Sequence, residues 1–414
     1  MTVAFRRTFA SLRKHRNYRL YFGGQVVSLV GTWMQNIGLA WYVVELTHSA
    51  VAVGFLAFCR FAPFTVFGLF SGVVADRFDN RRLVMVTQTA SMVVALALTV
   101  LAFSGAEVVW LAYALAAAAG TALVFDAPGR HALTFQMVGR DELPNAIALN
   151  ASLFNGSRVI GPAIAGVVVA AFGVGVCFAI NAVSFLAVLL ALALMRVDDL
   201  VKLDRPDEHP TVLRSVREGL SYARHSPQVR LVLAMTMVVS TVGFNFHVLV
   251  PVLASETLEA GARTFGVLSA SFGAGALTGA LLSAALGRAS WKALLAGVGG
   301  FSIALLALAP LETAVACAVL LYAVGVCFTL WTANSQSLLQ LSAPDHLRGR
   351  VLSLYLFAFA GLAPLGGLLS GWLSDVGGTQ LAFTVAGATG LLMTALALRE
   401  VYGRHGRRAV LTQA

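Results

Sequence analysis

Charge is scarce in this 414-residue chain: only 12% of its residues are Asp, Glu, Lys or Arg, about half the share of a soluble domain. Lysine is nearly absent, with three residues among the 29 basic ones. The phosphate-binding pattern Gly-x-x-x-x-Gly-Lys-Ser/Thr does not occur, and no polar segment is large enough to bind ATP. These absences argue against a soluble enzyme and against an ATP-driven pump.

Cysteine and clustered ionisable residues are also scarce. All four cysteines fall in apolar runs, at spacings that fit neither a disulfide framework nor a metal site. The grouped His, Asp and Glu residues that a membrane-embedded enzyme needs do not appear, and neither end of the chain is long enough for the output domain of a receptor. We therefore expect no enzymatic activity, no metal and no bound cofactor.

Long apolar runs dominate instead, and the mean hydropathy is +0.81. A helix of about 20 apolar residues crosses the hydrocarbon core of a membrane. The runs lack the alternation of a β-barrel strand. They predict an all-α membrane protein with twelve spans, at 20–46, 51–75, 83–104, 108–127, 145–170, 175–195, 231–254, 265–287, 293–310, 314–340, 351–373 and 381–398.

Basic residues fall almost entirely on one side of this topology. If the N-terminus lies inside, 26 of the 29 Lys and Arg residues fall in cytoplasmic segments, as the positive-inside rule requires. We therefore expect both termini in the cytoplasm and contacts with anionic lipids on that side. The net charge of +10 is then a topology signal, and nucleic-acid binding is the weaker interpretation.

The longest polar stretch divides the chain near its middle. Residues 196–230 form a predicted cytoplasmic linker between a six-span half at 1–195 and a second half with a basic tail at 231–414. Leu213, Val216 and Leu220 share one helical face, which favours an amphipathic helix on the inner membrane surface, although a flexible linker fits equally well. Asp141 and Asp345 coincide under a shift of 204, a weak repeat that supports two related halves.

Two segments resemble motifs of the major facilitator superfamily. "GVVADRFDNRR" between spans two and three is similar to its signature loop, with Gly72, Asp76, Arg77 and Arg81 in place, although Asp79 and Asn80 depart from it. "SRVIGPAIAG" in span five resembles the antiporter motif, with matches at Gly161, Pro162 and Gly166 and with Ser157 and Ala165 in place of glycines. The rest of the sequence resembles the branch of the superfamily that contains the enterobactin exporter and drug efflux proteins.

The resemblance implies two pseudo-symmetric halves and alternating access in a bacterial inner membrane, by a monomer. It also implies that Gly72 lets two spans approach closely and that Asp76 faces the N-terminal end of span eleven. A carboxylate at a helix N-terminus is worth about 0.3–1 kcal/mol. The loop would then be a conformational latch that holds the halves together on the cytoplasmic side.

Ionisable residues inside spans are costly, so each is a functional candidate. We expect the proton-coupling group to be Asp126, Glu45 or His247, and we assign a function to the deep cations Arg60 and Arg158. Each carboxylate also has a plain structural interpretation. Asp126 could pair with Arg130 at i,i+4, and Glu45 could be a wetted interfacial residue within possible reach of Arg60.

Further polar or aromatic residues are candidates for a substrate cavity: Gln35, Asn36, Asn155, Asn245, Trp331 and Asn334. Most single amides in spans only hydrogen-bond to neighbouring helices. Taken together, the sequence predicts proton-driven export of a drug-like amphiphile or a siderophore, energised by the proton gradient. The alternative is an uptake symporter or a lipid flippase on the same fold.

Overall fold

The computed structural model describes residues 9–201, 212–344 and 347–403. Within them it describes only the backbone of residues 69, 72, 73, 75, 76 and 212–216. Every regular element in this part of the chain is helical. Helices satisfy all their backbone hydrogen bonds internally, which is why they can cross a lipid bilayer.

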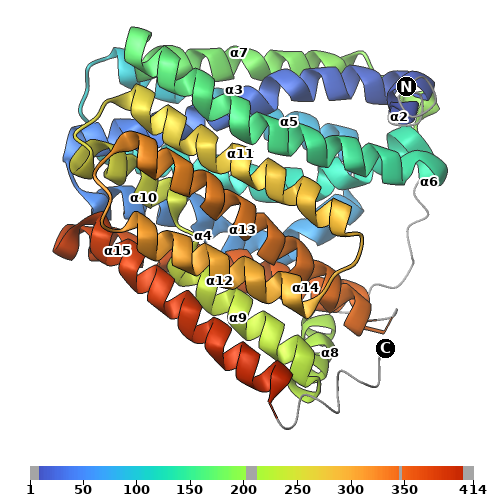
Figure 1. Ribbon diagram of the computed structural model, residues 1–414. Coiled ribbons are helices and arrows are strands. Elements are labelled where there is room, and N and C mark those ends of the chain that lie inside the picture. The colour runs from blue at the N-terminus through green and yellow to red at the C-terminus, as the bar shows by residue number, and fades with distance from the viewer. Residues whose placement is uncertain (1–8, 202–211, 345–346, 404–414) are drawn as a thin grey trace. The chain divides into compact units, whose positions relative to one another are not determined.

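Figure 1 shows the helices coloured from blue to red in chain order. Their bounds are α2 Ala10–Lys14, α3 Arg16–Thr47, α4 Ala50–Arg77, α5 Asn80–Phe103, α6 Val109–Phe172, α7 Val174–Ala193, η1 Val197–Asp199, α8 Val212–His225, α9 Pro227–Gly243, α10 Phe246–Val252, η2 Leu253–Thr257, α11 Ala262–Leu286, α12 Trp291–Leu308, α13 Ala314–Ser342, α14 Arg348–Ala360 and α15 Ala363–Tyr402.

Nine segments of the described chain are long and apolar enough to cross a membrane. Two of them are composite: Val109–Phe172 is broken at Gly139 and Arg348–Tyr402 at Gly377 and Gly378, where the φ angles of Gly139 and Gly378 are +69°. Each composite covers two predicted spans, and α3 covers the first. The helices are therefore consistent with twelve spans, and the all-α membrane fold is confirmed.

Several helix starts follow directly from local sequence. Asp79 caps α5, where its carboxylate accepts a hydrogen bond from the backbone N–H of Arg82 at 2.8 Å. Asp79 stands at a position where the signature motif has glycine. The difference from the motif therefore supplies the cap of α5. Ser226 caps α9, whose first residue is Pro227, a residue suited to that position.

The chain forms two compact units. One comprises Met1–Thr47, Cys59–His209 and Gly261–Ala270, and the other comprises His48–Phe58, Pro210–Ala260 and Ser271–Ala414. In the first unit α3 and α5 each pack against α6 and α7 (Figure 1). In the second unit α12 packs against α13 and α15, and α9 packs against α14 and α15.

Three predicted spans differ from the helices. The fourth span is predicted to end at residue 127, but α6 continues through Pro128 and Gly129 to the break at Gly139. The seventh predicted span is interrupted at residues 244 and 245, between α9 and α10, and the eleventh at residues 361 and 362, between α14 and α15. The linker does contain a helix, α8, as the amphipathic pattern predicts.

Candidate functional site

Asp126 is the centre of a buried polar cluster in the first unit. Its side chain is 2% exposed and forms an ion pair with Arg130, one turn further along α6. Thr87 and Gln88 of α5 donate to the Oδ1 atom of Asp126 at 2.7 and 2.9 Å. Arg130 in turn donates to Gln25 of α3. One carboxylate is therefore connected to three helices.

The cluster contains buried polar atoms that could form further hydrogen bonds. The hydroxyl of Tyr21, Nε2 of Gln25 and Oε1 of Gln88 are buried and have no hydrogen-bond partner among the described residues. Tyr21 and Gln25 lie at i,i+4 on one face of α3. Buried polar atoms that lack a partner are rare in native proteins, and they point to a bound water, an ion or a functional use.

The predicted pairing of Asp126 and Arg130 is confirmed, and the cluster shows that the pair is more than a helix-end contact. Because α6 continues to Gly139, the carboxylate lies inside the helix and not at its end. It is 1% exposed as a residue, so its charge is removed from water. A buried ionised pair of this kind requires further hydrogen bonds to be tolerated.

The two deep arginines lie in the same unit. Arg60, on α4, donates to the Oδ1 atom of Asn36, and its guanidinium carbon is 6.0 Å from the centroid of the Phe61 ring. Arg158, on α6, has its guanidinium carbon 5.9 Å from the Trp33 ring. Both arginines are partly buried. Arg60 is thus bound to Asn36, and the suggested contact with Glu45 does not form.

The other two proton-coupling candidates lie outside this cluster. Glu45 is exposed near the end of α3, as its interfacial interpretation predicts. His247 is partly buried in the first turn of α10, just after the break in the seventh span. Neither is buried as deeply as Asp126. Their part in proton movement stays a prediction.

The span-five motif is a site of close helix packing. A Cβ atom added at Gly161 would lie 3.1 Å from the carbonyl oxygen of Val30 on α3. One added at Gly166 would lie 2.8 Å from the Cα atom of Gly266 on α11, and one added at Gly266 would lie 2.8 Å from the carbonyl oxygen of Pro162. The motif therefore presses α6 against α3 and against the first turns of α11.

The signature loop is only partly visible. Gly72 and Asp76 lie in the helical backbone of α4, but their side chains are outside the described residues, so the latch stays a prediction. Arg77 is exposed. Arg81 donates to the carbonyl oxygen of Leu192 at 2.8 Å, near the end of α7, where a cation is favourable.

Asp375, near the end of the first part of α15, is a functional candidate that the sequence reasoning missed. Its carboxylate accepts hydrogen bonds from the backbone N–H groups of Ala50 at 2.7 Å and Val51 at 3.4 Å, and from the hydroxyl of Ser49 at 3.1 Å. It therefore caps the N-terminus of α4. These residues all belong to the second unit.

A sequence signal for Asp375 exists. Ser370 and Gly371 precede it with the spacing Ser-Gly-x-x-x-Asp, which is also the spacing of Ser71, Gly72 and Asp76. A Cβ atom added at Gly371 would lie 2.6 Å from the carbonyl oxygen of Ala50, so the glycine permits the close approach of α15 to α4. A search for this spacing within the chain would have found the contact.

Most of the proposed cavity residues bond to other groups of the protein. Asn181 donates to Gln35 at 2.8 Å, Asn155 donates to a carbonyl oxygen of its own helix, and Asn245, in the break after α9, donates to the carbonyl oxygen of Thr241. Asn334 accepts from the backbone N–H of Ser290, and Trp331 is fully buried within an aromatic cluster of the second unit. Asn36 instead bonds Arg60. Substrate contact by these residues stays a prediction.

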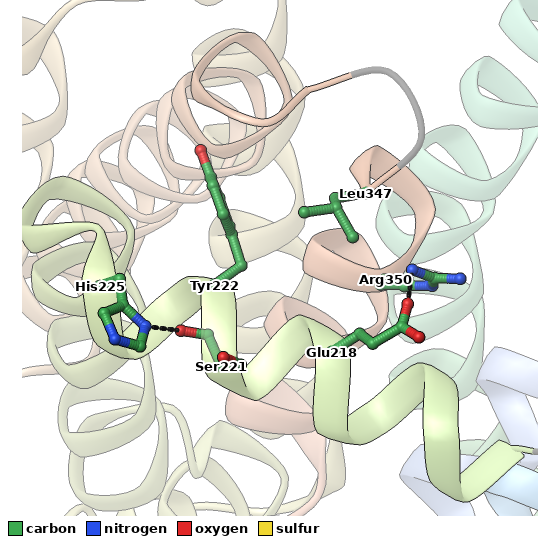
Figure 2. Close-up of a pocket in the computed structure, with 6 residues that line it drawn as sticks. All are labelled: Glu218, Ser221, Tyr222, His225, Leu347 and Arg350. Carbon is green, nitrogen blue, oxygen red and sulfur yellow. Dashed lines mark hydrogen bonds and ion pairs between the residues drawn. The ribbon is translucent and has the colours of Figure 1, made fainter.

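The helix of the linker is docked on the protein. Residues of α8 line a shallow surface pocket together with Leu347 and Arg350, and Figure 2 shows these side chains. Glu218 forms an ion pair with Arg350, and the hydroxyl of Tyr222 donates to the carbonyl oxygen of Ser342 at 2.6 Å. This face of α8 packs against α14, and the predicted contact of the helix with lipid is not tested.

Comparison with known proteins agrees with these features. The chain is 26% identical to the staphyloferrin A transporter of Staphylococcus aureus, over 91% of this chain and 94% of that one. It is 23% identical to macrolide efflux protein A of Streptococcus pyogenes, over 91% and 95%. With the enterobactin exporter EntS of Shigella flexneri it shares 26% identity, over 94% and 92%.

Solved structures support the fold. The nucleoside transporter NupG matches with a TM-score of 0.73 at 10% identity, over 92% of this chain and 98% of that one. The model of the transmembrane secretion effector family matches residues 6–408. The chain is therefore a multi-pass membrane transporter, not an enzyme, and it belongs to the transmembrane secretion effector family of the major facilitator superfamily.

Proposed function

We propose that the protein exports a small organic compound across the bacterial inner membrane in exchange for protons, by alternating access. The observation that carries the proposal is the buried Asp126–Arg130 pair and its connections to α3 and α5. The staphyloferrin A transporter, the macrolide efflux protein and the enterobactin exporter support a small-molecule cargo. Both termini are cytoplasmic in this proposal.

The cluster offers a physical route from proton binding to helix movement. Protonation of Asp126 removes the negative charge that compensates the buried Arg130. An uncompensated buried charge costs about 3–5 kcal/mol. Arg130 then gains by moving toward other acceptors or water, and Gln25 transmits that movement to α3. The spare polar atoms of Tyr21 and Gln88 can accommodate the rearranged hydrogen bonds.

Alternating access also requires contacts that break. In this proposal the cap of Asp375 on α4 holds the outer side closed, and Asp76 serves the same purpose on the cytoplasmic side in the opposite state. The repeated Ser-Gly-x-x-x-Asp spacing supports this pairing of roles. Inverted repeats, which relate spans of opposite orientation, are common in this superfamily.

The proposal is tested in energised inside-out membrane vesicles, with the internal pH followed while dyes, macrolides and siderophores are added singly. We expect at least one compound to dissipate the gradient in vesicles with the protein and not in empty vesicles. Asp126→Asn should abolish this effect. The matched control is Glu107→Gln, which removes an exposed carboxylate just before α6.

The other outcomes are equally informative. Dissipation that survives Asp126→Asn would assign the proton to Glu45 or His247 and overturn the role of the cluster. If no compound in a broad panel dissipates the gradient, proton-coupled export is wrong, and uptake or lipid movement becomes the working hypothesis.

A further inference from the structure

Two glutamines contact the buried ion pair of Asp126 and Arg130 from different helices. Gln25, on α3, accepts a hydrogen bond from Nη1 of Arg130 through its Oε1 atom. Gln88, on α5, donates from its Nε2 atom to Oδ1 of Asp126 at 2.9 Å. The side-chain amide of a glutamine has an accepting end and a donating end. Each glutamine therefore turns toward the ion pair the end that suits the charge it faces.

Packing alone does not explain a glutamine at either position. Gln25 is 4% exposed and Gln88 is 1% exposed. The second polar atom of each amide, Nε2 of Gln25 and Oε1 of Gln88, has no hydrogen-bond partner among the described residues. A buried polar atom without a partner is costly, and an apolar side chain of similar length, such as methionine, would leave none. The glutamines are therefore explained by their contacts with the ion pair.

Arg130 lies between a charged acceptor and a neutral one. Its Nε atom donates to Oδ2 of Asp126 on the same helix, and its Nη1 atom donates to Gln25 on α3. The guanidinium is planar and rigid, so two bonds to different partners fix its orientation. The carboxylate supplies the negative charge that compensates Arg130, and the amide supplies an acceptor without a charge.

Tyr21 is a further titratable group of the cluster. It lies one turn before Gln25 on α3, is 2% exposed, and interacts electrostatically with both Arg130 and Asp126. The helix α5 contributes a hydroxyl and an amide, which are neutral. Gln25→Glu would keep the length and shape of the side chain and would place a carboxylate oxygen against Nη1 of Arg130.

We propose that Gln25 is a positioning residue of proton exchange, which holds Arg130 against α3 without compensating its charge. Position 25 is then a second place from which a carboxylate can compensate Arg130. The role in exchange rests on the proposed function. Protonation of Asp126 leaves Arg130 bonded to a neutral amide on α3, so movement of the guanidinium acts on that helix. Gln88 has the complementary part and holds the carboxylate.

The first test is thermal unfolding of the purified protein in a neutral detergent, with no proton gradient and no transported compound. Asp126→Asn should lower the unfolding temperature by several degrees, because it leaves the charge of Arg130 uncompensated. Addition of Gln25→Glu should restore most of this loss. Gln88→Glu is the matched control, since it makes the same change in the same cluster at the glutamine that bonds the carboxylate, and it should restore none.

The single glutamate variants keep the test decisive if Asp126→Asn does not fold. Gln25→Glu places a carboxylate against a guanidinium, whereas Gln88→Glu places one against a carboxylate. Like charges at close range disfavour each other. Gln88→Glu should therefore lower the unfolding temperature more than Gln25→Glu does, and the reverse order would contradict the proposal.

The second test measures proton movement in the energised vesicles, with the compound that dissipates the gradient. Gln25→Met removes the acceptor and keeps an unbranched side chain of similar length. It should lower the maximal rate about tenfold, the factor that corresponds to the loss of one hydrogen bond to a charged group. The concentration of compound that gives half of the maximal rate should not change, because Gln25 holds Arg130 and not the compound.

Three results would overturn the proposal: no recovery of Asp126→Asn by Gln25→Glu, equal recovery by Gln88→Glu, or an unchanged maximal rate in folded Gln25→Met. The unfolding test needs neither a compound nor a gradient, so it is independent of proton exchange. If Gln25→Glu restores Asp126→Asn while no compound dissipates the gradient, the exchange is wrong and the compensation of Arg130 from position 25 remains.

Discussion

Removal of the Asp375 carboxylate should release the N-terminus of α4. The carboxylate accepts three hydrogen bonds from residues 49–51. Loss of a capping side chain typically costs about 0.5–2 kcal/mol. Asp375 is solvent-exposed, which screens its charge, so we take about 1–1.5 kcal/mol for Asp375→Ala. Asn keeps an acceptor and should lose less than Ala.

The expected effect is a larger population of the state in which the N-terminus of α4 has separated from Asp375 of α15. A difference of about 1–1.5 kcal/mol corresponds to about 5–12-fold in an equilibrium constant. Ala50 is 3% exposed in the structure, so a cysteine at this position reports that state. The four native cysteines are first replaced, and labelling by a membrane-impermeant maleimide is followed in whole cells.

Asp375→Ala should accelerate labelling of Ala50→Cys about 5–12-fold, and Asp375→Asn less. Glu312→Ala is the control, because Glu312 lines the same cavity of about 380 Å³ as Asp375 but no hydrogen bond joins it to α4 among the described residues. Unchanged labelling in a folded, membrane-inserted Asp375→Ala protein would show that the cap does not hold α4. Equal acceleration by Glu312→Ala would attribute the effect to charge alone.

Three further predictions concern packing and stability, and all are measured as thermal unfolding in detergent. Gly54→Ala should destabilise by about 1–3 kcal/mol, because its Cβ atom would lie 2.6 Å from the carbonyl oxygen of Gly367, whereas Gly23→Ala, with no atom within 4 Å, should not. Arg130→Met should destabilise by about 3–5 kcal/mol, and adding Asp126→Leu should restore most of the loss; additive losses would contradict the pairing. Asp79→Ala should cost about 1 kcal/mol, since it removes the cap of α5, and an unchanged unfolding temperature would exclude that role.

Span positions were predictable because the hydrocarbon core imposes a length on each apolar run. Helix breaks were harder to predict. The break within α6 falls at Gly139, whose φ angle is positive, and the interruption after α9 falls between Gly243 and Phe246. Glycines also lie inside unbroken helices of this chain, such as Gly275 in α11, so a glycine alone does not identify where a helix is interrupted.

The site was predictable only where partners are close in sequence. The i,i+4 spacing predicts the pair of Asp126 and Arg130, but Gln25, Thr87 and Gln88 come from other helices. Long-range side-chain contacts of this kind leave no periodic signal in one sequence. Motifs bridge that gap in part: the glycines of span five were identified by resemblance, and their partner Gly266 was not.

The buried ion pair is itself an argument for a function. Apolar residues of similar volume at Asp126 and Arg130 would hold the helix at least as well, because the desolvation of two charges offsets most of their attraction. The chain nevertheless adds acceptors and donors from α3 and α5 to keep the pair buried. The Asp126–Arg130 pair adds little to the stability of the fold, but it can act as a switch. Protonation of the Asp126 carboxylate changes the charge balance of the cluster that three helices share. The double replacement separates these two roles: a stable protein that no longer exchanges protons identifies the pair as the coupling element.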